Sequence, residues 1–209
     1  MIPRLHLVEL EDQSWFPARI RDYATDYLRF VEAQMALHRP IAAILAGALR
    51  ATQAGCIVDL CSGGAGPIPA LVQDLANAGL PVRFVLTDRY PNLAAFKGAA
   101  QASGGLIEYV AEPVDARRVP PDLGGFRTLF NSLHHFRPED ASAIIRDAAE
   151  AGQPIAIIDT ANRSPENIVG LFLFTPLMVL LATPLIRPFR WGRLFWTYLV
   201  PLVPLTCWW

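Results

Sequence analysis

The residues with the clearest chemical potential lie together in residues 56–67, CIVDLCSGGAGP. The apolar residues at the start of this stretch suit a buried strand. Gly63, Gly64 and Gly66 tolerate positive φ and let a ligand lie against the backbone. Pro67 suits the first position of a helix, where no amide donor is needed. A strand, a glycine turn and a helix N-terminus offer amides and a positive dipole end to a ligand, so this stretch predicts a nucleotide-binding turn.

More polar side chains follow the strands that the rest of the chain predicts. Apolar runs at residues 57–60, 82–87, 106–110, 126–130 and 154–159 alternate with helical patterns at about 68–77, 92–102 and 138–152. This alternation, with short connections, predicts a Rossmann-like, doubly wound α/β fold with a mostly parallel sheet. Ligands bind beyond the carboxyl ends of such strands. The polar residues expected at or near those ends are Asp59, Asp88, Asp115, Asn131, His134, His135 and Asp159.

Two common phosphate-binding motifs do not fit the glycine turn. A dinucleotide fingerprint G-x-G-x-x-G counted from Gly64 has Pro69 in place of its third glycine, the one that allows close helix packing. This departure counts against NAD or FAD. The sequence also contains no G-x-x-x-x-G-K-[ST], which excludes a P-loop.

Residues 58–66, VDLCSGGAG, resemble motif I of the class I S-adenosylmethionine (SAM)-dependent methyltransferases, and later landmarks of that family follow in order as far as Asp159. The resemblance implies that Asp88 holds both ribose hydroxyls and that Asp115 contacts the adenine amine. It also implies that residues 131–136, NSLHHF, lie beside the methyl group. Residues 12–17 and the apolar C-terminal stretch are similar to a bacterial, membrane-associated group within the family.

The candidate residues suit SAM because its sulfonium group is a cation, which favours carboxylates over a phosphate cradle. The bases that could take a proton from a methyl acceptor are His134 and His135, since histidine titrates near neutral pH. Because these two are adjacent, we do not expect both to point the same way, and one is then structural. Asp59 either holds the turn or contacts the SAM amino group through water. The residues expected to bind SAM are Asp59, Ser62, Gly63, Gly64, Gly66, Asp88, Asp115 and Asn131.

The chain divides into three predicted parts: a helical cap at residues 1–50, a SAM-binding domain at 51–163 and an apolar segment at 164–209. The cap is expected to contain helices at 15–31 and 41–49, which either pack on the domain or form a lid over a ligand. The apolar segment is uncharged from Ile168 to Ile186, and a membrane-spanning helix needs about 20 apolar residues. Three interpretations compete: the segment spans the membrane, lies in the interface, or covers the active site.

The interface is the interpretation that we prefer for the apolar segment. Pro176 and Pro184 weaken a straight span. A single crossing would also place Arg187, Arg190 and Arg193 outside, against the positive-inside tendency. A re-entrant or interfacial hairpin instead returns this arginine-rich turn to anionic headgroups, at the cytoplasmic face of the membrane. Class I methyltransferases usually end with a β6–β7 hairpin, and nothing after residue 159 predicts one, so we expect it to be missing or truncated.

Net charge and cysteine spacing narrow the classes of ligand that we expect the chain to bind. A formal net charge of −1 indicates no general attraction to nucleic acid. Cys56, Cys61 and Cys207 lack metal-ligand spacing, so we expect no metal and reduced thiols. The leading hypothesis is a SAM-dependent methyltransferase acting on a hydrophobic or membrane-associated small molecule. The alternatives are a non-catalytic membrane-anchored protein that retains the fold and, less favoured, an NAD-dependent oxidoreductase.

Overall fold

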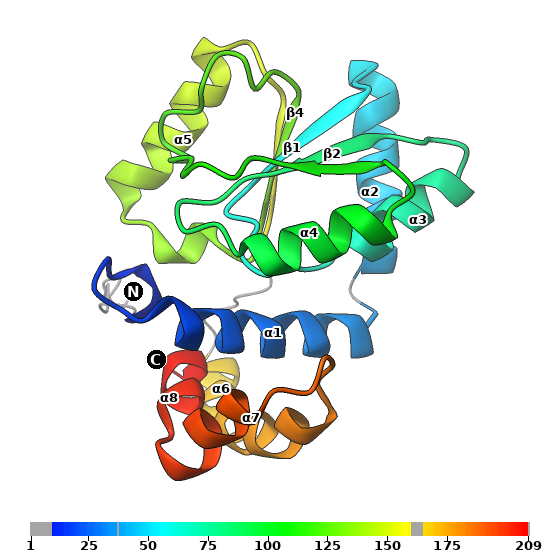
Figure 1. The fold of residues 1–209 in the computed structure, drawn as a ribbon. Helices are drawn as coiled ribbons and strands as arrows, with labels where there is room; N and C mark the ends of the chain where they lie inside the picture. The colour runs from blue at the N-terminus through cyan, green and yellow to red at the C-terminus, as the bar shows by residue number, and fades with distance from the viewer. Residues whose placement is uncertain (1–9, 37, 160–164, 209) are drawn as a thin grey trace. The chain divides into compact units, whose positions relative to one another are not determined.

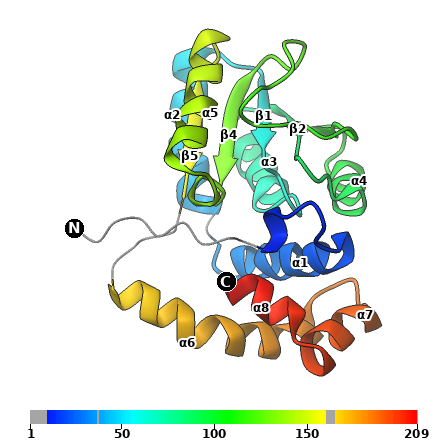
Figure 2. The same cartoon turned by 90° about the vertical axis from the view of Figure 1, so that its left-hand side faces the viewer.

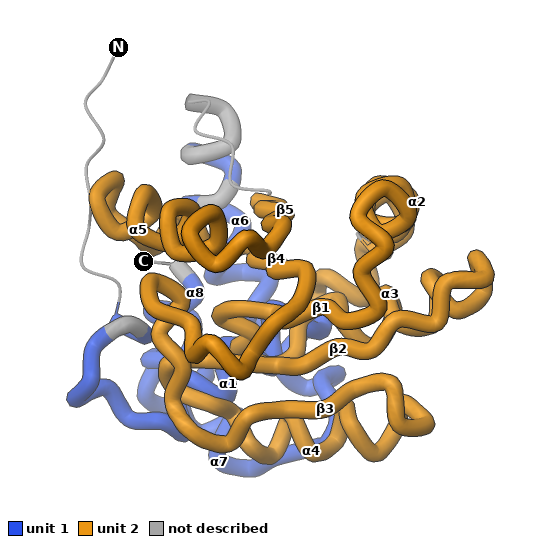
Figure 3. The backbone as a smooth tube through the Cα atoms, turned by 90° about the horizontal axis from the view of Figure 1, so that it is seen from above, with its two compact units in different colours: residues 1–30, 161–209 blue, residues 31–160 orange. Residues whose placement is uncertain are grey.

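A computed structural model of the chain describes residues 10–36, 38–159 and 165–208. The chain forms two compact units, shown in different colours in Figure 3. Residues 31–160 form the sheet unit, and residues 1–30 together with 161–209 form the tail unit. Helix α1 (Ala18–Gln34) contributes residues to both units. The predicted division at residues 50 and 163 stays a prediction.

The sheet unit has the predicted fold, a Rossmann-like parallel sheet with helices on both faces (Figure 1). All strand pairs are parallel and the strand order is β3-β2-β1-β4-β5. The order reverses between β1 and β4, where doubly wound folds bind their ligands. The strands are β1 (Cys56–Leu60), β2 (Arg83–Leu86), β3 (Ile107–Tyr109), β4 (Phe126–Phe130) and β5 (Ile155–Ile158). The helices are α2 (His38–Thr52), α3 (Ile68–Asn77), α4 (Leu93–Ala102) and α5 (Pro138–Glu150), with a short 3-10 turn, η2 (Leu133–His135).

The core of the sheet unit follows the alternation of side chains along the strands. Ile57 and Phe84 pack with residues of α2, α3 and α4 on one face. Val58 and Leu129 pack with Ile144 of α5 on the other face. Figure 1 shows α5 and α2 on opposite sides of the strands, and Figure 2 gives the same fold turned by 90° about the vertical axis. Strands buried on both faces explain why the sequence reads as continuous apolar runs there.

Two details of the predicted helical cap are wrong. Trp15 was expected on the apolar face of a helix, but it precedes α1 and is 69% exposed. The second helix, α2, begins at His38, two positions before Pro40, and continues to Thr52. Proline is tolerated there because the amides of the first helical turn have no carbonyl partner within the helix, so the missing N–H costs no hydrogen bond.

The described part of the tail unit is helical. Its elements are η1 (Leu10–Asp12), residues 18–30 of α1, α6 (Pro165–Ala182), η3 (Thr183–Leu185), α7 (Trp191–Leu194), the π-helical stretch η4 (Phe195–Leu199) and α8 (Leu202–Trp208). Pro176 lies inside α6, which packs against α8. None of the helices in the described ranges has the length and apolar character that a membrane crossing requires. The described residues that follow β5 contain no strand, and the absence of a β6–β7 hairpin stays a prediction.

Candidate functional site

The glycine turn joins the end of β1 to α3 and is tied to β2. Ser62 donates its amide to the carbonyl of Thr87 at 2.9 Å, and Thr87 donates its amide to the carbonyl of Asp59 at 3.0 Å. Positive φ values in the turn fall at Cys61, Gly63, Ala65 and Gly66, not at the predicted Gly64. Non-glycine residues rarely adopt this conformation. The backbone of the turn is therefore strained at Cys61 and Ala65, which are not glycine.

Pro67 does not occupy the first helical position that the sequence predicted. It is the N-cap residue of α3, and Pro69 lies in the first turn of that helix instead. The side chain of Pro67 makes no capping hydrogen bond. The amides of Ile68, Ala70 and Leu71 instead donate to the carbonyls of Ala65 and Pro67 at 3.0, 3.1 and 3.0 Å, so ligand binding at the start of α3 stays a prediction.

Asp59 and Ser62 form a buried network that holds the turn. The strand register pairs Asp59 with Thr128 of β4, whose hydroxyl donates to Asp59 Oδ1 at 2.6 Å. Ser62 donates its hydroxyl to Asp59 Oδ2 at 2.7 Å and accepts the amide of Thr87 at 3.1 Å. Burial raises the pKa of Asp59 to about 7; the hydroxyl hydrogen bonds oppose this rise, and the charges of Asp88 and Glu32 add to it. The first alternative for Asp59, holding the turn, matches this geometry, and direct binding of SAM by either residue stays a prediction.

Asp88 connects the glycine turn to the loop after β2. Its Oδ2 accepts the Gly63 amide at 2.7 Å, and its Oδ1 accepts the Tyr90 amide at 2.8 Å. Its backbone carbonyl accepts the amide of Val114 at 2.8 Å, which brings the loop after β3 to the same edge of the sheet. A carboxylate oxygen can accept more than one hydrogen bond, so these contacts are compatible with hydroxyl donors from a ribose.

Asp115 belongs to an ion-pair network within its own loop. Arg117 donates Nη2 to Asp115 Oδ2 at 2.6 Å and Nε to Oδ1 at 3.0 Å, while its Nη1 reaches Asp140 at 2.9 Å. Hydrogen bonds from Arg117 hold the pKa of Asp115 below its ordinary value. Asp115 lies one residue from Val114, and so near Asp88, as predicted. A contact with adenine would compete with Arg117 for the carboxylate, and this predicted role is untested.

Glu32 is a site residue that the sequence did not reveal. Asn131, which follows β4 and has a φ of 47°, donates Nδ2 to Glu32 Oε1 at 2.8 Å. A Cβ atom added at Gly66 would lie 3.3 Å from Glu32 Oε2, so the carboxylate sits directly against the glycine turn. Burial raises the pKa of Glu32, while the hydrogen bond from Asn131 lowers it. Glu32 and Asn131 are 99 positions apart, and no local pattern links them.

The two histidines lie side by side on η2, contrary to the expectation that they point in different directions. Their ring centroids are 4.4 Å apart with an interplanar angle of 34°. His134 Nδ1 lies 2.9 Å from Asp159 Oδ2 and 3.0 Å from Oδ1, and the His134 amide donates to the same carboxylate at 3.2 Å. When Nδ1 donates its proton to Asp159, the lone pair of the neutral imidazole resides on Nε2. This pairing distinguishes His134 as the oriented base candidate.

The carboxylates around the glycine turn indicate which charge a bound ligand should carry. Burial is the main cause of the raised pKa of Asp59, and repulsion from the negative charges of Asp88 and Glu32 adds to it. A cation placed among them would relieve this repulsion, whereas a phosphate would increase it. Among the described residues, no group of histidine, cysteine and acidic side chains has the arrangement of a metal site. The residues therefore fit a cationic nucleoside such as SAM better than a pyrophosphate cofactor.

No protein-family model matches the chain, and no curated protein matches it either. Among solved structures, the chain is similar to an O-methyltransferase family protein from Burkholderia thailandensis, with 19% sequence identity and a TM-score of 0.48. The match covers 70% of this chain and 46% of that protein's chain. The chain thus spans less than half the length of the solved structure that it matches.

Proposed function

We propose that the sheet unit binds SAM and transfers its methyl group to a small molecule. One observation carries this proposal: Asp88 accepts the Gly63 amide at 2.7 Å, at an edge of the sheet where Glu32 also lies against Gly66. Carboxylates in direct contact with a glycine turn suit a ligand that combines a ribose diol with a positive charge. They disfavour NAD, whose pyrophosphate would meet negative charge at the same turn.

The residues of the site would divide the work between binding and proton transfer. When bound, SAM supplies an electrophilic methyl group on a sulfonium centre. Asp88 would accept hydrogen bonds from the ribose hydroxyls, and the backbone at Gly63 and Gly66 would allow the ligand to approach closely. His134 would take a proton from the acceptor at Nε2, while Asp159 holds the ring through Nδ1. Much of the rate acceleration would come from positioning, because methyl transfer requires an in-line approach.

We further propose a hydrophobic or membrane-associated acceptor and a location at the cytoplasmic face of the membrane. The support lies in the tail unit, where Phe172, Leu173 and Trp191 are more than half exposed. A surface with so many exposed apolar side chains is typical of a binding or membrane-contact region. The acceptor would then be delivered from an apolar phase.

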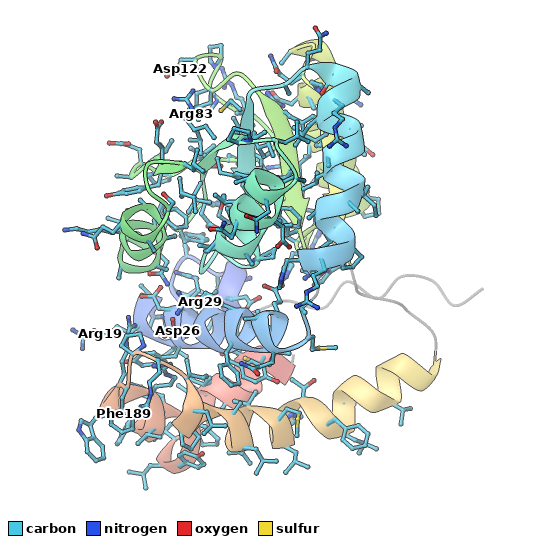
Figure 4. The ribbon with its side chains drawn as sticks, turned by 90° about the vertical axis from the view of Figure 1, so that its right-hand side faces the viewer. Arg19, Asp26, Arg29, Arg83, Asp122 and Phe189 are labelled. Carbon is cyan, nitrogen blue, oxygen red and sulfur yellow. The ribbon has the colours of Figure 1, made fainter. Side chains whose placement is uncertain are left out.

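Titration calorimetry with SAM and with S-adenosylhomocysteine tests the binding step. We expect both ligands to bind the full chain and Asp88→Ala to weaken SAM binding at least about tenfold, because a charged acceptor of hydrogen bonds is lost. Asp122→Ala is the matched control, since Asp122 is exposed on a loop of the same unit (Figure 4). A folded protein that binds neither ligand, or an Asp88 variant that binds like the control, would refute the proposal.

A non-catalytic protein that binds SAM is the second candidate, and the edge of the sheet formed by β5 favours it. β5 pairs only with β4, and the described residues that follow β5 supply no further strand. Incubation with tritium-labelled SAM and a lipid or quinone extract separates the two candidates. SAM binding without transfer of label to the extract would favour the non-catalytic protein, and labelled lipid or quinone would favour the enzyme.

A further inference from the structure

The outer face of α6 is apolar and exposed. Val169, Leu173, Leu177 and Leu181 recur every four residues and are 56%, 62%, 47% and 60% exposed, so they form one row along the helix. Phe174 and Met178 lie beside this row on the helix and are also exposed, as is Leu185 in η3. The opposite face is buried through Val179 and Thr183. An apolar helix with one face packed and the other open to solvent requires a further apolar partner.

Cations and aromatic rings continue this surface beyond η3. Arg187 and Phe189 are exposed, Trp191 is 78% exposed, and the side chain of Arg190 is 34% exposed. Residues 167–209 contain Arg187, Arg190 and Arg193 and no lysine or acidic residue, so the segment is positively charged. Arginine beside tryptophan and phenylalanine is the composition of a membrane interface, where aromatic rings lie at headgroup level and cations meet lipid phosphates.

A buried ion cluster holds this arginine-rich segment to α1 within the tail unit. Asp26 Oδ2 lies 3.5 Å from Arg190 Nη1 and 3.5 Å from Arg193 Nη1, and Asp26 Oδ1 lies 3.4 Å from Arg29 Nη2. Arg193 also donates Nη2 to the carbonyl of Pro188 at 2.6 Å. Figure 4 shows Asp26 and Arg29 on α1 and Phe189 on the segment before α7. The cluster fixes the backbone from which Phe189 and Trp191 extend, so the surface is formed before any partner binds.

We propose that the apolar row of α6 together with Arg187, Phe189, Arg190 and Trp191 is a docking surface for an anionic phospholipid interface. The apolar side chains enter the boundary between headgroups and acyl chains, and Arg187 and Arg190 meet the lipid phosphates. The positive charge of the segment favours an anionic bilayer over a second copy of the chain, whose matching surface would carry the same charge. This inference concerns the location that we propose for the enzyme, and it does not require methyl transfer.

Vesicle flotation with the full chain tests the docking surface. We expect the protein to float with vesicles of phosphatidylglycerol and phosphatidylcholine in equal parts, and to float less as salt is raised. Leu173→Glu should lower the partition coefficient at least about tenfold, because a leucine side chain that would enter the apolar boundary of the bilayer is replaced by a charge. Ile44→Glu is the matched control, since Ile44 is 69% exposed on α2 of the sheet unit and should float normally.

Arg187→Gln separates the contribution of charge from that of the apolar row. It should weaken binding about fivefold on the mixed vesicles and leave the weaker binding to pure phosphatidylcholine unchanged. Arg146→Gln is its control, because Arg146 is exposed on α5 of the sheet unit, and this change should alter binding to neither kind of vesicle. Flotation that Leu173→Glu leaves intact would overturn the proposal, as would a dimer in solution that Leu173→Glu converts to a monomer. Calorimetry with SAM on the same samples keeps this result separate from that of the proposed enzyme.

Discussion

The two compact units place charge and apolar surface in opposite ways. The sheet unit buries apolar residues on both faces of its strands and gathers Glu32, Asp59 and Asp88 at one edge. The tail unit buries Asp26 and Arg193, which are 2% and 1% exposed, and leaves large apolar side chains such as Phe172 and Trp191 open to solvent. The sheet unit thus gathers carboxylates at one edge of a sheet that is buried on both faces. The tail unit buries charge and leaves large apolar side chains exposed, which is typical of an interaction surface.

The largest predicted effect on this comparison comes from removing the negative charge of Asp26, which is buried in the tail unit. Asp26→Ala leaves the buried guanidinium of Arg193 without a carboxylate, and we expect a loss of about 3–5 kcal/mol in the free energy of unfolding. Urea denaturation measures this loss. Asp26→Leu combined with Arg193→Met should recover most of it, because a buried ion pair can be replaced by apolar packing. A single variant as stable as the wild type would show that the cluster is not buried in solution.

The next largest effect concerns the base in the sheet unit. His134→Gln should lower the rate of methyl transfer about a hundredfold and leave SAM binding unchanged, because the ring acts on the proton of the acceptor. The measurement is the initial rate of label transfer from SAM to the extract. His135→Gln is the matched control, because Asp159 holds the ring of His134 through Nδ1 of that residue. A larger loss of transfer rate in the His135 variant would show that His135, and not His134, is the base.

Asp59 gives the sheet unit a characteristic dependence on pH. Its pKa is about 7 in the folded chain against an ordinary value of 3.8, so the folded state binds more protons between these values. The stabilisation is complete below pH 3.8 and is lost as the pH rises through about 7. The unfolding free energy of the wild type, minus that of Asp59→Asn, should therefore fall from about pH 4 to about pH 7 and level off above.

Denaturant titrations at several pH values measure this difference. Subtracting the variant cancels the effects of shifted groups that do not interact with Asp59, such as Asp115, whose pKa is lowered. A difference that does not change with pH would show that Asp59 keeps an ordinary pKa, and hence that water reaches the turn between β1 and α3.

Local pattern was enough to predict most of the sheet unit. The bounds predicted for α3 and β4 agree with the structure, because apolar periodicity is a property of neighbouring residues. The strand ends also placed Asp88 and His134 at the same edge of the sheet. Parallel strands bring their carboxyl ends together whatever the details of their loops, which explains this success.

The parts that sequence could not supply depend on contacts between distant segments or on exact backbone conformation. Glu32 meets Asn131 from 99 positions away, so nothing in its helix marks it as a site residue. The neighbouring, tilted rings of His134 and His135 depend on the 3-10 turn that carries them. The pairing of Asp26 with Arg190 and Arg193 joins segments more than 160 residues apart in the chain, and an apolar tail alone does not predict it.

The smallest predicted effect returns to the outer face of α6. Leu173 is 62% exposed, so Leu173→Gln should change the free energy of unfolding by no more than about 0.5 kcal/mol in the absence of lipid. Leu71→Ala in the core of the sheet unit, where the side chain is 0% exposed, should cost about 2–5 kcal/mol. Urea denaturation of both variants makes the comparison. If Leu173→Gln were as costly as Leu71→Ala, the row on α6 would be packed against protein in solution, and the tail unit would no longer differ from the sheet unit in the surface it leaves uncovered.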